Sequence, residues 1–466
     1  MKKLIGTALV LALALLLVPP PARPAGTALP APEKIVLKNG LTVFFLKNSD
    51  LPTVSLRLIV RGAGSAFDTA GTEGAAGLAA ALMTKGTAKM DAEAIAEALD
   101  FMGASLFIST TDEYAQASGD SLAEHLPRLL EIVADCLTTP AFKDDEFAKE
   151  RALRIDGLKA AKDNPGQAVR LYFQNAYFGG HPLGRLDSGT EASLEQMTVQ
   201  TVKDFYVKRY RPDRAIAAVV GAVDGPALTA LLERTLGAWK NPAGAAPSDI
   251  IPPLPAPKGK SLLLVDKPDA TQAYFALGAP GYAMGDKITP PAAVMNTLLG
   301  GRFTSWLNTE LRIKRGLTYG ASSTFRTWAA GGLFSAGSYT KNDKIGEMLD
   351  ITLGLLDKAA AGAFTAEEVE SSRNYIQGQF PRTLETNASK AGAYVRLAFY
   401  GLGFDYYDAY MAAIGKVTPA EVNKAAAALI PKDRYVLVVV GKAADIGPQL
   451  RKYGAWQEKK ISAPGF

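Results

Sequence analysis

Thr198-Val-Gln-Thr-Val202 and, a few residues later, Arg211-Pro-Asp-Arg-Ala-Ile-Ala-Ala-Val-Val-Gly221 form a stretch that returns in the second half of the same chain. The second copy is Thr418-Pro-Ala-Glu-Val422 followed by Pro431-Lys-Asp-Arg-Tyr-Val-Leu-Val-Val-Val-Gly441. Thr, Val, Asp, Arg and Gly recur in the same register without a gap, from Thr198 and Thr418 to Gly221 and Gly441. Each copy predicts a capped helix, a turn and a buried strand.

A looser echo belongs to the same repeat. Asp145-Glu-Phe147 with Arg151 resembles Glu367-Glu-Val369 with Arg373, in nearly the same register. Chance alone does not readily produce an ordered series of matching residues of this kind. The sequence therefore predicts a duplication that gives two homologous domains of about 200 residues each.

The chain has 466 residues, which is too long for one hydrophobic core. We expect a first domain over residues 29–240, a linker over 241–260 and a second domain over 261–466. The linker should be extended and semi-rigid because it is rich in proline, namely Pro242, Pro247, Pro252, Pro253, Pro255 and Pro257.

The first 28 residues are typical of a secretory signal peptide. Lys2 and Lys3 precede an apolar run over residues 4–18, which is short for a membrane span. Gly26-Thr-Ala28 offers small residues for cleavage. We therefore expect a protein exported to a bacterial periplasm, and an uncleaved membrane anchor is the weaker alternative.

Charge and cysteine content narrow the class of protein further. The formal net charge of +5 falls to +2 without the first 28 residues, which carry Lys2, Lys3 and Arg23 and no acid. No Lys/Arg cluster indicates nucleic-acid binding, and no later stretch is long and apolar enough to span a membrane. Cys136 is the only cysteine, so neither an internal disulfide nor an N-terminal lipid anchor is expected.

Each half mixes strands and helices. In the first half we expect adjacent antiparallel strands over 41–46 and 53–60, and another strand over 105–118. Its helices should cover 75–85, 92–102 with Asp91 as N-cap, 123–136 and 144–162. The second half should contain strands over 261–265 and 273–277, a helix over 291–299 and a strand after Leu317. The fold class is α+β, with a mixed, mostly antiparallel sheet in each domain and helices packed on one face.

An ordered series of motifs runs along the whole mature chain. It includes the small-residue helix Gly74-Ala-Ala-Gly-Leu-Ala-Ala-Ala-Leu-Met-Thr-Lys-Gly-Thr87. The others are Asn39-Gly-Leu-Thr-Val43, Gly180-His-Pro-Leu-Gly-Arg185, Arg211-Pro-Asp-Arg214, Gly301-Arg-Phe-Thr-Ser305 and Arg315-Gly-Leu-Thr-Tyr319. In this order the chain resembles the pitrilysin/insulinase family of zinc peptidases, in its short branch with mitochondrial processing peptidase. The resemblance implies the two-domain fold of those metallopeptidases.

The resemblance also implies that this chain lacks the family's zinc site. Active members carry H-x-x-E-H, which places two imidazoles on one face of a helix with a glutamate as general base. The matching positions are Gly77, Ala80 and Ala81. The third ligand usually comes from a helix further along the chain, and that register falls on Gly157, next to Asp156. We therefore expect no metal and no other cofactor in this chain.

Histidine content agrees with that expectation. The chain contains only His125, within a predicted helix, and His181, before Pro182 in a glycine-rich turn. A zinc site needs several ligands that converge, and neither histidine has another His or Cys nearby in sequence. We interpret both as structural residues.

The other half of the family's site is present. In the relatives, an arginine and a tyrosine of the second domain hydrogen-bond the bound peptide, and the resemblance places them at Arg315 and Tyr319. A guanidinium and a phenol can donate to a carbonyl oxygen and stabilise charge that develops on it. The alternative is that Arg315 merely caps a helix before Gly316 and that Tyr319 packs in a strand.

Two hypotheses about function follow from this pattern. In the first, the chain is the non-catalytic subunit of a heterodimeric zinc peptidase, with the zinc on a homologous partner subunit and an unfolded or extended peptide as substrate. In the second, it is a peptide-binding or scaffold protein with no role in proteolysis. A self-sufficient metallopeptidase is disfavoured because the residues offer no three-ligand zinc set. Gly300-Gly301 lacks the spacing of a nucleotide-binding loop.

Overall fold

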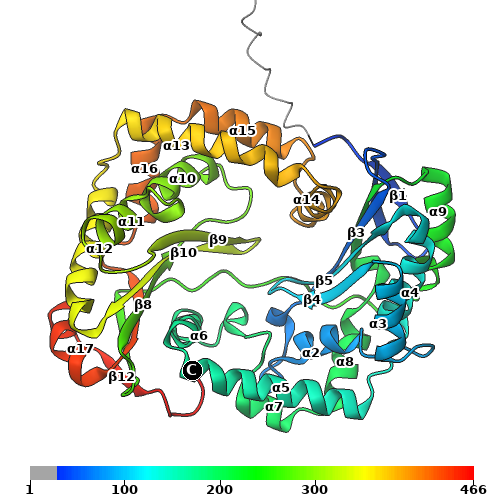
Figure 1. The fold of residues 1–466 in the computed structure, drawn as a ribbon, viewed down its shortest axis with the longest axis horizontal. Helices are drawn as coiled ribbons and strands as arrows, with labels where there is room; N and C mark the ends of the chain where they lie inside the picture. The colour runs from blue at the N-terminus through cyan, green and yellow to red at the C-terminus, as the bar shows by residue number, and fades with distance from the viewer. Residues whose placement is uncertain (1–28) are drawn as a thin grey trace, which may run out of the picture.

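The computed structural model describes residues 29–466, so the expected signal peptide lies outside the described residues. Two six-stranded sheets organise the chain, one in each half (Figure 1). The first contains β1 (Glu33–Val36), β2 (Thr42–Lys47), β3 (Thr53–Arg61), β4 (Ser105–Thr110), β5 (Tyr114–Leu122) and β6 (Ala215–Gly221). The second contains β7 (Lys260–Asp266), β8 (Gln272–Pro280), β9 (Ser322–Trp328), β10 (Gly331–Lys341), β11 (Tyr435–Gly441) and β12 (Gln457–Lys460).

Strand order confirms that the two halves repeat one design. The sheets run β1-β2-β6-β3-β5-β4 and β12-β7-β11-β8-β10-β9. The repeated strands β6 and β11 take the same place, parallel to one neighbour and antiparallel to the other. Only the outermost strand differs, because β1 is antiparallel to β2 whereas β12 is parallel to β7. The α+β class with mixed, mostly antiparallel sheets is confirmed.

Two strand predictions for the first half were wrong. β2 and β3 are not adjacent, because β6 lies between them and pairs with both. Sequence proximity had favoured a hairpin, but the seven-residue apolar β6 needs a neighbour on each side to bury its backbone. The single strand expected over 105–118 is a hairpin of β4 and β5. Its turn is held by Thr111, whose Oγ1 accepts the N–H groups of Glu113 and Tyr114, both at 3.2 Å.

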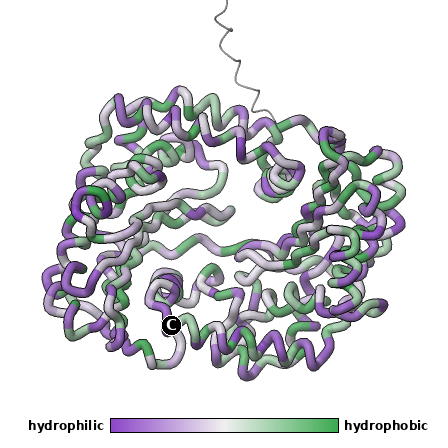
Figure 2. The backbone as a smooth tube through the Cα atoms, viewed as in Figure 1, coloured by the Kyte–Doolittle hydropathy of each residue, from purple (hydrophilic) through white to green (hydrophobic). Residues whose placement is uncertain are grey.

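Helices surround both sheets. The first half contains α2 (Ala75–Leu82), α3 (Ala92–Phe101), α4 (Leu126–Thr138), α5 (Asp144–Asp163), α6 (Pro165–Phe178), α7 (Glu191–Gln196), α8 (Val199–Arg209) and α9 (Gly225–Arg234). The second contains α10 (Thr289–Asn296), α11 (Trp306–Asn308), α12 (Ile345–Ala360), α13 (Ala366–Gln379), α14 (Asn387–Phe399), α15 (Tyr406–Lys416), α16 (Pro419–Leu429) and α17 (Ala443–Leu450). The outer helices alternate between hydrophobic and hydrophilic residues (Figure 2), as expected for helices with one face on a core.

Capping side chains set where the repeated helices begin. Thr198 Oγ1 accepts the N–H of Thr201 at 3.2 Å before α8, and Thr418 Oγ1 accepts the N–H of Glu421 at 3.3 Å before α16. Asp91 caps α3 as expected, accepting the N–H of Ala94 at 2.9 Å. These bonds satisfy N–H groups that the first turn of a helix leaves unpaired.

Each half of the chain contributes one helix that packs on the sheet of the other half. Helix α6 of the first half packs on β8 and β11 of the second sheet, where Phe173 fills the space left open by Gly278. Helix α14 of the second half packs on β3 and β6 of the first sheet, in a cluster that includes Tyr394. In Figure 1, α14 lies beside β3 and α6 lies beside β8. Each sheet is therefore covered by its own helices on one face and by a helix of the other half on the opposite face.

The segment expected to be a linker is extended and fixed at several points. Arg211 Nη1 donates to Pro242 O at 3.2 Å, and Arg209 Nη1 donates to Ser248 O at 2.9 Å. Ile251 is buried against the first core. These contacts tie the connection between the halves to the surface of the first half.

Candidate functional site

The helix at the expected zinc position, α2, is almost completely buried. Its first turn is capped from a distance in sequence by Asp68, whose Oδ2 accepts the N–H of Gly74 at 2.8 Å and whose Oδ1 accepts the N–H of Ala76 at 2.9 Å. A carboxylate is favoured at a helix N-terminus by the helix dipole. Burial nevertheless raises the pKa of Asp68 to about 7, more than these hydrogen bonds lower it.

Gly77 has no room for a side chain. A Cβ atom at this position would lie 2.3 Å from the carbonyl oxygen of Asp187 and 2.8 Å from Nη1 of Arg154. Glycine in a helix interior costs about 1 kcal/mol relative to alanine. The close backbone contact with Asp187 requires the residue without a Cβ.

The guanidinium of Arg154, from α5, lies against Gly77. Its Nη1 donates to Asp187 O at 2.7 Å. Its Nε is buried without a hydrogen-bond partner, and burial lowers the pKa of the group, which the charges of Asp187, Glu150 and Asp68 oppose. A fixed cation here repels a metal ion and leaves no space for an imidazole, so zinc does not fit this helix.

The other expected ligand positions are no better suited. Ala80 is buried and Ala81 is half-buried on α2. Gly157 and its neighbour Asp156 are exposed on α5, and a Cβ at Gly157 would meet no atom within 4 Å. Among residues 29–466, no three His, Cys, Asp or Glu side chains converge into a group that could hold a metal ion.

The two histidines lie in short 3-10 turns or directly before one. His181 Nδ1 accepts the N–H of Leu183 at 3.2 Å, and its Nε2 lies 3.1 Å from Pro252 O. His181 therefore shapes a turn and contacts the segment between the halves. His125 lies in a short 3-10 turn, Ala123–His125, at the start of α4 rather than within the α-helix.

Arg315 and Tyr319 lie at the end of a helix and in the loop after it. Arg315 is the C-cap of the π-helical segment η8 (Thr309–Lys314), and Gly316 follows with φ +62°. The Arg315 side chain is 46% exposed, with its Nη2 3.8 Å from Oε2 of Glu310. Tyr319 is 80% exposed and precedes β9, so the alternative that it packs in a strand is wrong.

Both residues line one cavity of about 580 Å³. Its wall also includes Arg312, Lys341 and Lys344, and none of the described lining residues is acidic. We call this space the cationic cavity. The sequence indicated only Arg315 and Tyr319. Arg312 is in the same helical segment as Arg315, whereas Lys341 and Lys344 come from a distant segment that the fold brings beside it.

Buried carboxylates join the two halves. Asp112, in the β4–β5 turn, accepts from Arg326 Nη2 at 2.5 Å and from Trp328 Nε1 at 2.7 Å, both on β9. Glu113 Oε2 accepts the Tyr400 hydroxyl at 2.7 Å. Burial raises the pKa of both carboxyl groups. Sequence reasoning missed this contact because its partners come from opposite halves of the chain and share no local pattern.

Asp112→Ala should destabilise the protein by about 2 kcal/mol, because the buried indole N–H of Trp328 loses its acceptor. The matched control is Arg326→Ala. The Arg326 side chain is 53% exposed, so its loss should cost less than about 1 kcal/mol. Denaturant unfolding of the three proteins measures both changes. Equal losses for the two variants would contradict this account of the contact.

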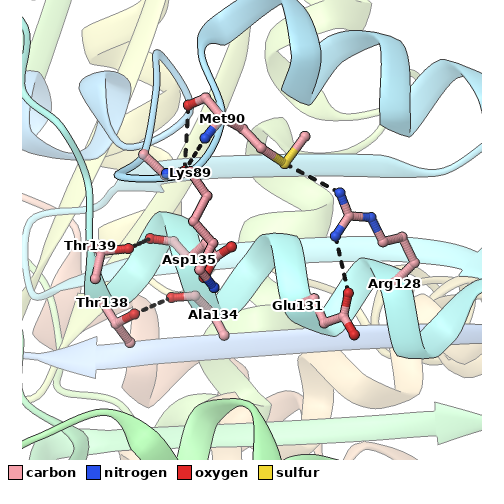
Figure 3. A network of polar contacts seen from close by, with 9 residues as sticks. Lys89, Met90, Arg128, Glu131, Ala134, Asp135, Thr138 and Thr139 are labelled. Atoms are coloured by element: carbon pink, nitrogen blue, oxygen red, sulfur yellow. Dashed lines mark hydrogen bonds and ion pairs between the residues drawn. The ribbon is translucent and has the colours of Figure 1, made fainter.

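A second cavity lies on the first half beside α4. Lys89 Nζ donates to Asp135 Oδ1 at 2.7 Å across its wall, while Arg128 pairs with Glu131 at 3.0 Å along the same helix (Figure 3). The hydroxyl of Tyr210, also in the wall, is buried without a hydrogen-bond partner. No pattern in the sequence had indicated this cavity.

Two family models match the chain. Residues 42–191 match the model described as Insulinase (Peptidase family M16), and residues 196–376 match the model described as Peptidase M16 inactive domain. The chain is 28% identical over 424 residues to an uncharacterized zinc protease of Mycobacterium tuberculosis, covering 90% of this chain and 95% of the relative.

Solved structures agree with the family models. A crystal structure of a peptidase M16 inactive domain from Pseudomonas fluorescens superposes with a TM-score of 0.82 at 26% identity, covering 88% of this chain and 97% of that one. A protease from Helicobacter pylori superposes with the same TM-score of 0.82 at 23% identity, covering 88% and 99%, and shares the fold. The chain belongs to the insulinase (M16) peptidase family.

Proposed function

We propose that this chain is the non-catalytic subunit of a heterodimeric zinc peptidase. One observation carries the proposal: the helix at the family's zinc position is closed by Arg154 and the Asp187 carbonyl, whereas Arg315 and Tyr319 are exposed on an open cavity. A chain with no role in proteolysis would gain nothing from an exposed Arg315–Tyr319 pair once its zinc position is closed. The zinc would belong to a homologous partner subunit.

The chemistry of the pair suits peptide binding. The Arg315 guanidinium and the Tyr319 hydroxyl are donors that can hold a backbone carbonyl of the substrate and stabilise charge on its oxygen during attack. Zinc and a glutamate on the partner would activate the attacking water. The role of this chain is therefore to bind and orient an unfolded or extended peptide.

A sheet edge could hold such a peptide by strand addition. β4 is the last strand of the first sheet and pairs only with β5, so its other edge has no strand partner among the described residues. Phe107 on β4 is 71% exposed. An extended peptide segment added at this edge would form backbone hydrogen bonds with β4 and would bury the Phe107 ring.

We also propose that the protein is exported to the bacterial periplasm, on the basis of the charged and apolar pattern of residues 1–28. Within residues 29–466 no helix is long and apolar enough to cross a membrane. Detection of the processed chain in a periplasmic fraction, by mass spectrometry of its new N-terminus, tests the proposal.

With the partner present, Arg315→Ala and Tyr319→Phe should each lower turnover by roughly 10- to 1,000-fold, the range for loss of one donor to an oxyanion. The substrate is a quenched fluorescent peptide library, and the partner is the homologue that co-purifies with the native protein. Arg128→Ala is the control, since this guanidinium pairs with Glu131 on α4, away from the cavity. Unchanged turnover in both variants would remove the pair from the site.

The same preparation separates the two functional hypotheses. The isolated chain should bind no stoichiometric zinc and cleave no peptide, and the mixture should cleave in a chelator-sensitive manner. One tight zinc per isolated chain, measured by elemental analysis, would contradict the proposal. Native protein that co-purifies with no homologous subunit would favour the peptide-binding scaffold instead.

A further inference from the structure

The cationic cavity is formed by donors from two segments of the second half that are separate in sequence, residues 312–319 and 339–344. Arg312 and Arg315 come from the end of η8, and Tyr319 from the loop that follows. Tyr339 and Lys341 come from the end of β10, and Lys344 from the turn after it. No aspartate or glutamate is among the described residues of its wall. Such a wall attracts anions.

Internal ion pairs neutralise only part of this charge. Arg315 is 3.8 Å from Glu310, which Lys314 also contacts at 2.6 Å, and Lys344 is 3.2 Å from Glu347. Arg312 and Lys341 make no ion pair among the described residues. The Arg312 guanidinium lies instead over the Phe303 ring, 4.7 Å from its centre. Two positive charges are thus available to a ligand.

The uncharged groups of the cavity are also hydrogen-bond donors. The hydroxyls of Tyr319 and Tyr339 donate to no group among the described residues. Tyr339 is held in place by stacking on Tyr274, with ring centres 4.9 Å apart and an interplanar angle of 14°. Cations and phenols together match a group with acceptors only, and an ionised carboxylate is such a group.

We infer that the cationic cavity binds a carboxylate of the peptide substrate. This inference rests on the proposed function, in which Arg315 and Tyr319 hold the peptide backbone at the same cavity. A volume of about 580 Å³ falls within the usual range for ligand pockets and exceeds what one small ion needs. The carboxylate belongs to an acidic side chain or to the C-terminus of the peptide.

Binding of matched peptides to the full chain tests this inference. The probes are fluorescent, extended peptides of equal length with no other charge: one with a central Glu and an amidated C-terminus, one with Gln in its place, and the Gln peptide with a free C-terminus. At low salt, anisotropy should show at least about tenfold tighter binding for a carboxylate peptide than for the amidated Gln peptide, which corresponds to about 1.4 kcal/mol. The peptide that gains affinity identifies the source of the carboxylate.

Variants that remove a positive charge test whether the preference for the carboxylate peptide arises in the cationic cavity. Lys341→Gln and Arg312→Gln should each reduce the preference for the carboxylate severalfold, and raised salt should weaken it because exposed charges are screened. Lys424→Gln on α16 is the matched control, since this lysine lies outside the cavity wall and should leave the preference unchanged. Loss of preference in Lys424→Gln to the same degree would overturn the assignment to this cavity.

The outcomes distinguish this inference from the proposed function. If all three peptides bind equally and Arg315→Ala weakens all of them, the carboxylate inference fails and the peptide-binding function stands. If no peptide binds, both fail. Inorganic phosphate that displaces the Glu peptide at equal concentration would show a site for phosphate rather than for a peptide carboxylate, which also overturns the inference.

Discussion

Gly77→Ala should destabilise the protein by about 2 kcal/mol, although alanine is the better helix former. The added Cβ would lie 2.3 Å from the carbonyl oxygen of Asp187, a backbone atom that cannot move aside alone. Gly77→His should cost about 3 kcal/mol or more, because an imidazole also meets the Arg154 guanidinium. The measurement is the free energy of unfolding in denaturant.

Gly157→Ala is the matched control on α5. Its added Cβ would meet no atom within 4 Å, so the variant should gain up to about 1 kcal/mol from helix propensity. A chain carrying Gly77→His, Ala80→Glu, Ala81→His and Gly157→Glu together should still bind no zinc at stoichiometric concentration. Tight zinc in that chain, or stabilisation by Gly77→Ala, would show that the site is merely vacant and not closed.

Asp68 should make the protein less stable as the pH rises from about 4 to 7. Burial raises its pKa from 3.8 to about 7 in the folded state, so the folded chain holds a proton that the unfolded chain has lost. The contribution is full below the unfolded pKa and is lost as the pH rises through the folded pKa. At about 1.4 kcal/mol for each pKa unit, the whole change is about 4 kcal/mol.

Asp68→Asn isolates this contribution because an amide does not titrate in this range. Unfolding free energies of both proteins, measured at several values of pH between about 4 and 8, give a difference curve that removes other titrating groups such as Asp112. The difference should change by about 3 to 4 kcal/mol in favour of the variant as the pH rises. Parallel curves would mean that Asp68 is ionised throughout.

Short-range patterns predicted most of the fold. The capping threonines Thr198 and Thr418 and the apolar runs after them indicated two helices and two central strands that the structure contains. Strand pairing was harder to predict, because it depends on contacts between strands that are far apart in sequence. β6 is inserted between β2 and β3, although those two strands are close in sequence.

The sequence predicted those parts of the candidate site whose chemistry depends on residue type alone. No fold can supply a metal-ligating side-chain atom at Gly77, Ala80, Ala81 or Gly157. Hydrogen-bond donors are present in any fold on Arg315 and Tyr319. The sequence offered no sign that Arg154 would lie against Gly77, since many arginines occur on helices. Nor did it indicate that Lys341 and Lys344 would join Arg315, because they come from another segment and follow no period.

The sequence by itself determined the duplicated α+β design and the loss of zinc ligands, since both depend on residue identity and on neighbours within a few turns. Only the tertiary structure decided that Arg154 closes the zinc position, that α6 and α14 are exchanged between the halves, and that donors from two distant segments form one cavity. These features depend on contacts between groups far apart in sequence, and such contacts are fixed by the packing of whole sheets and helices.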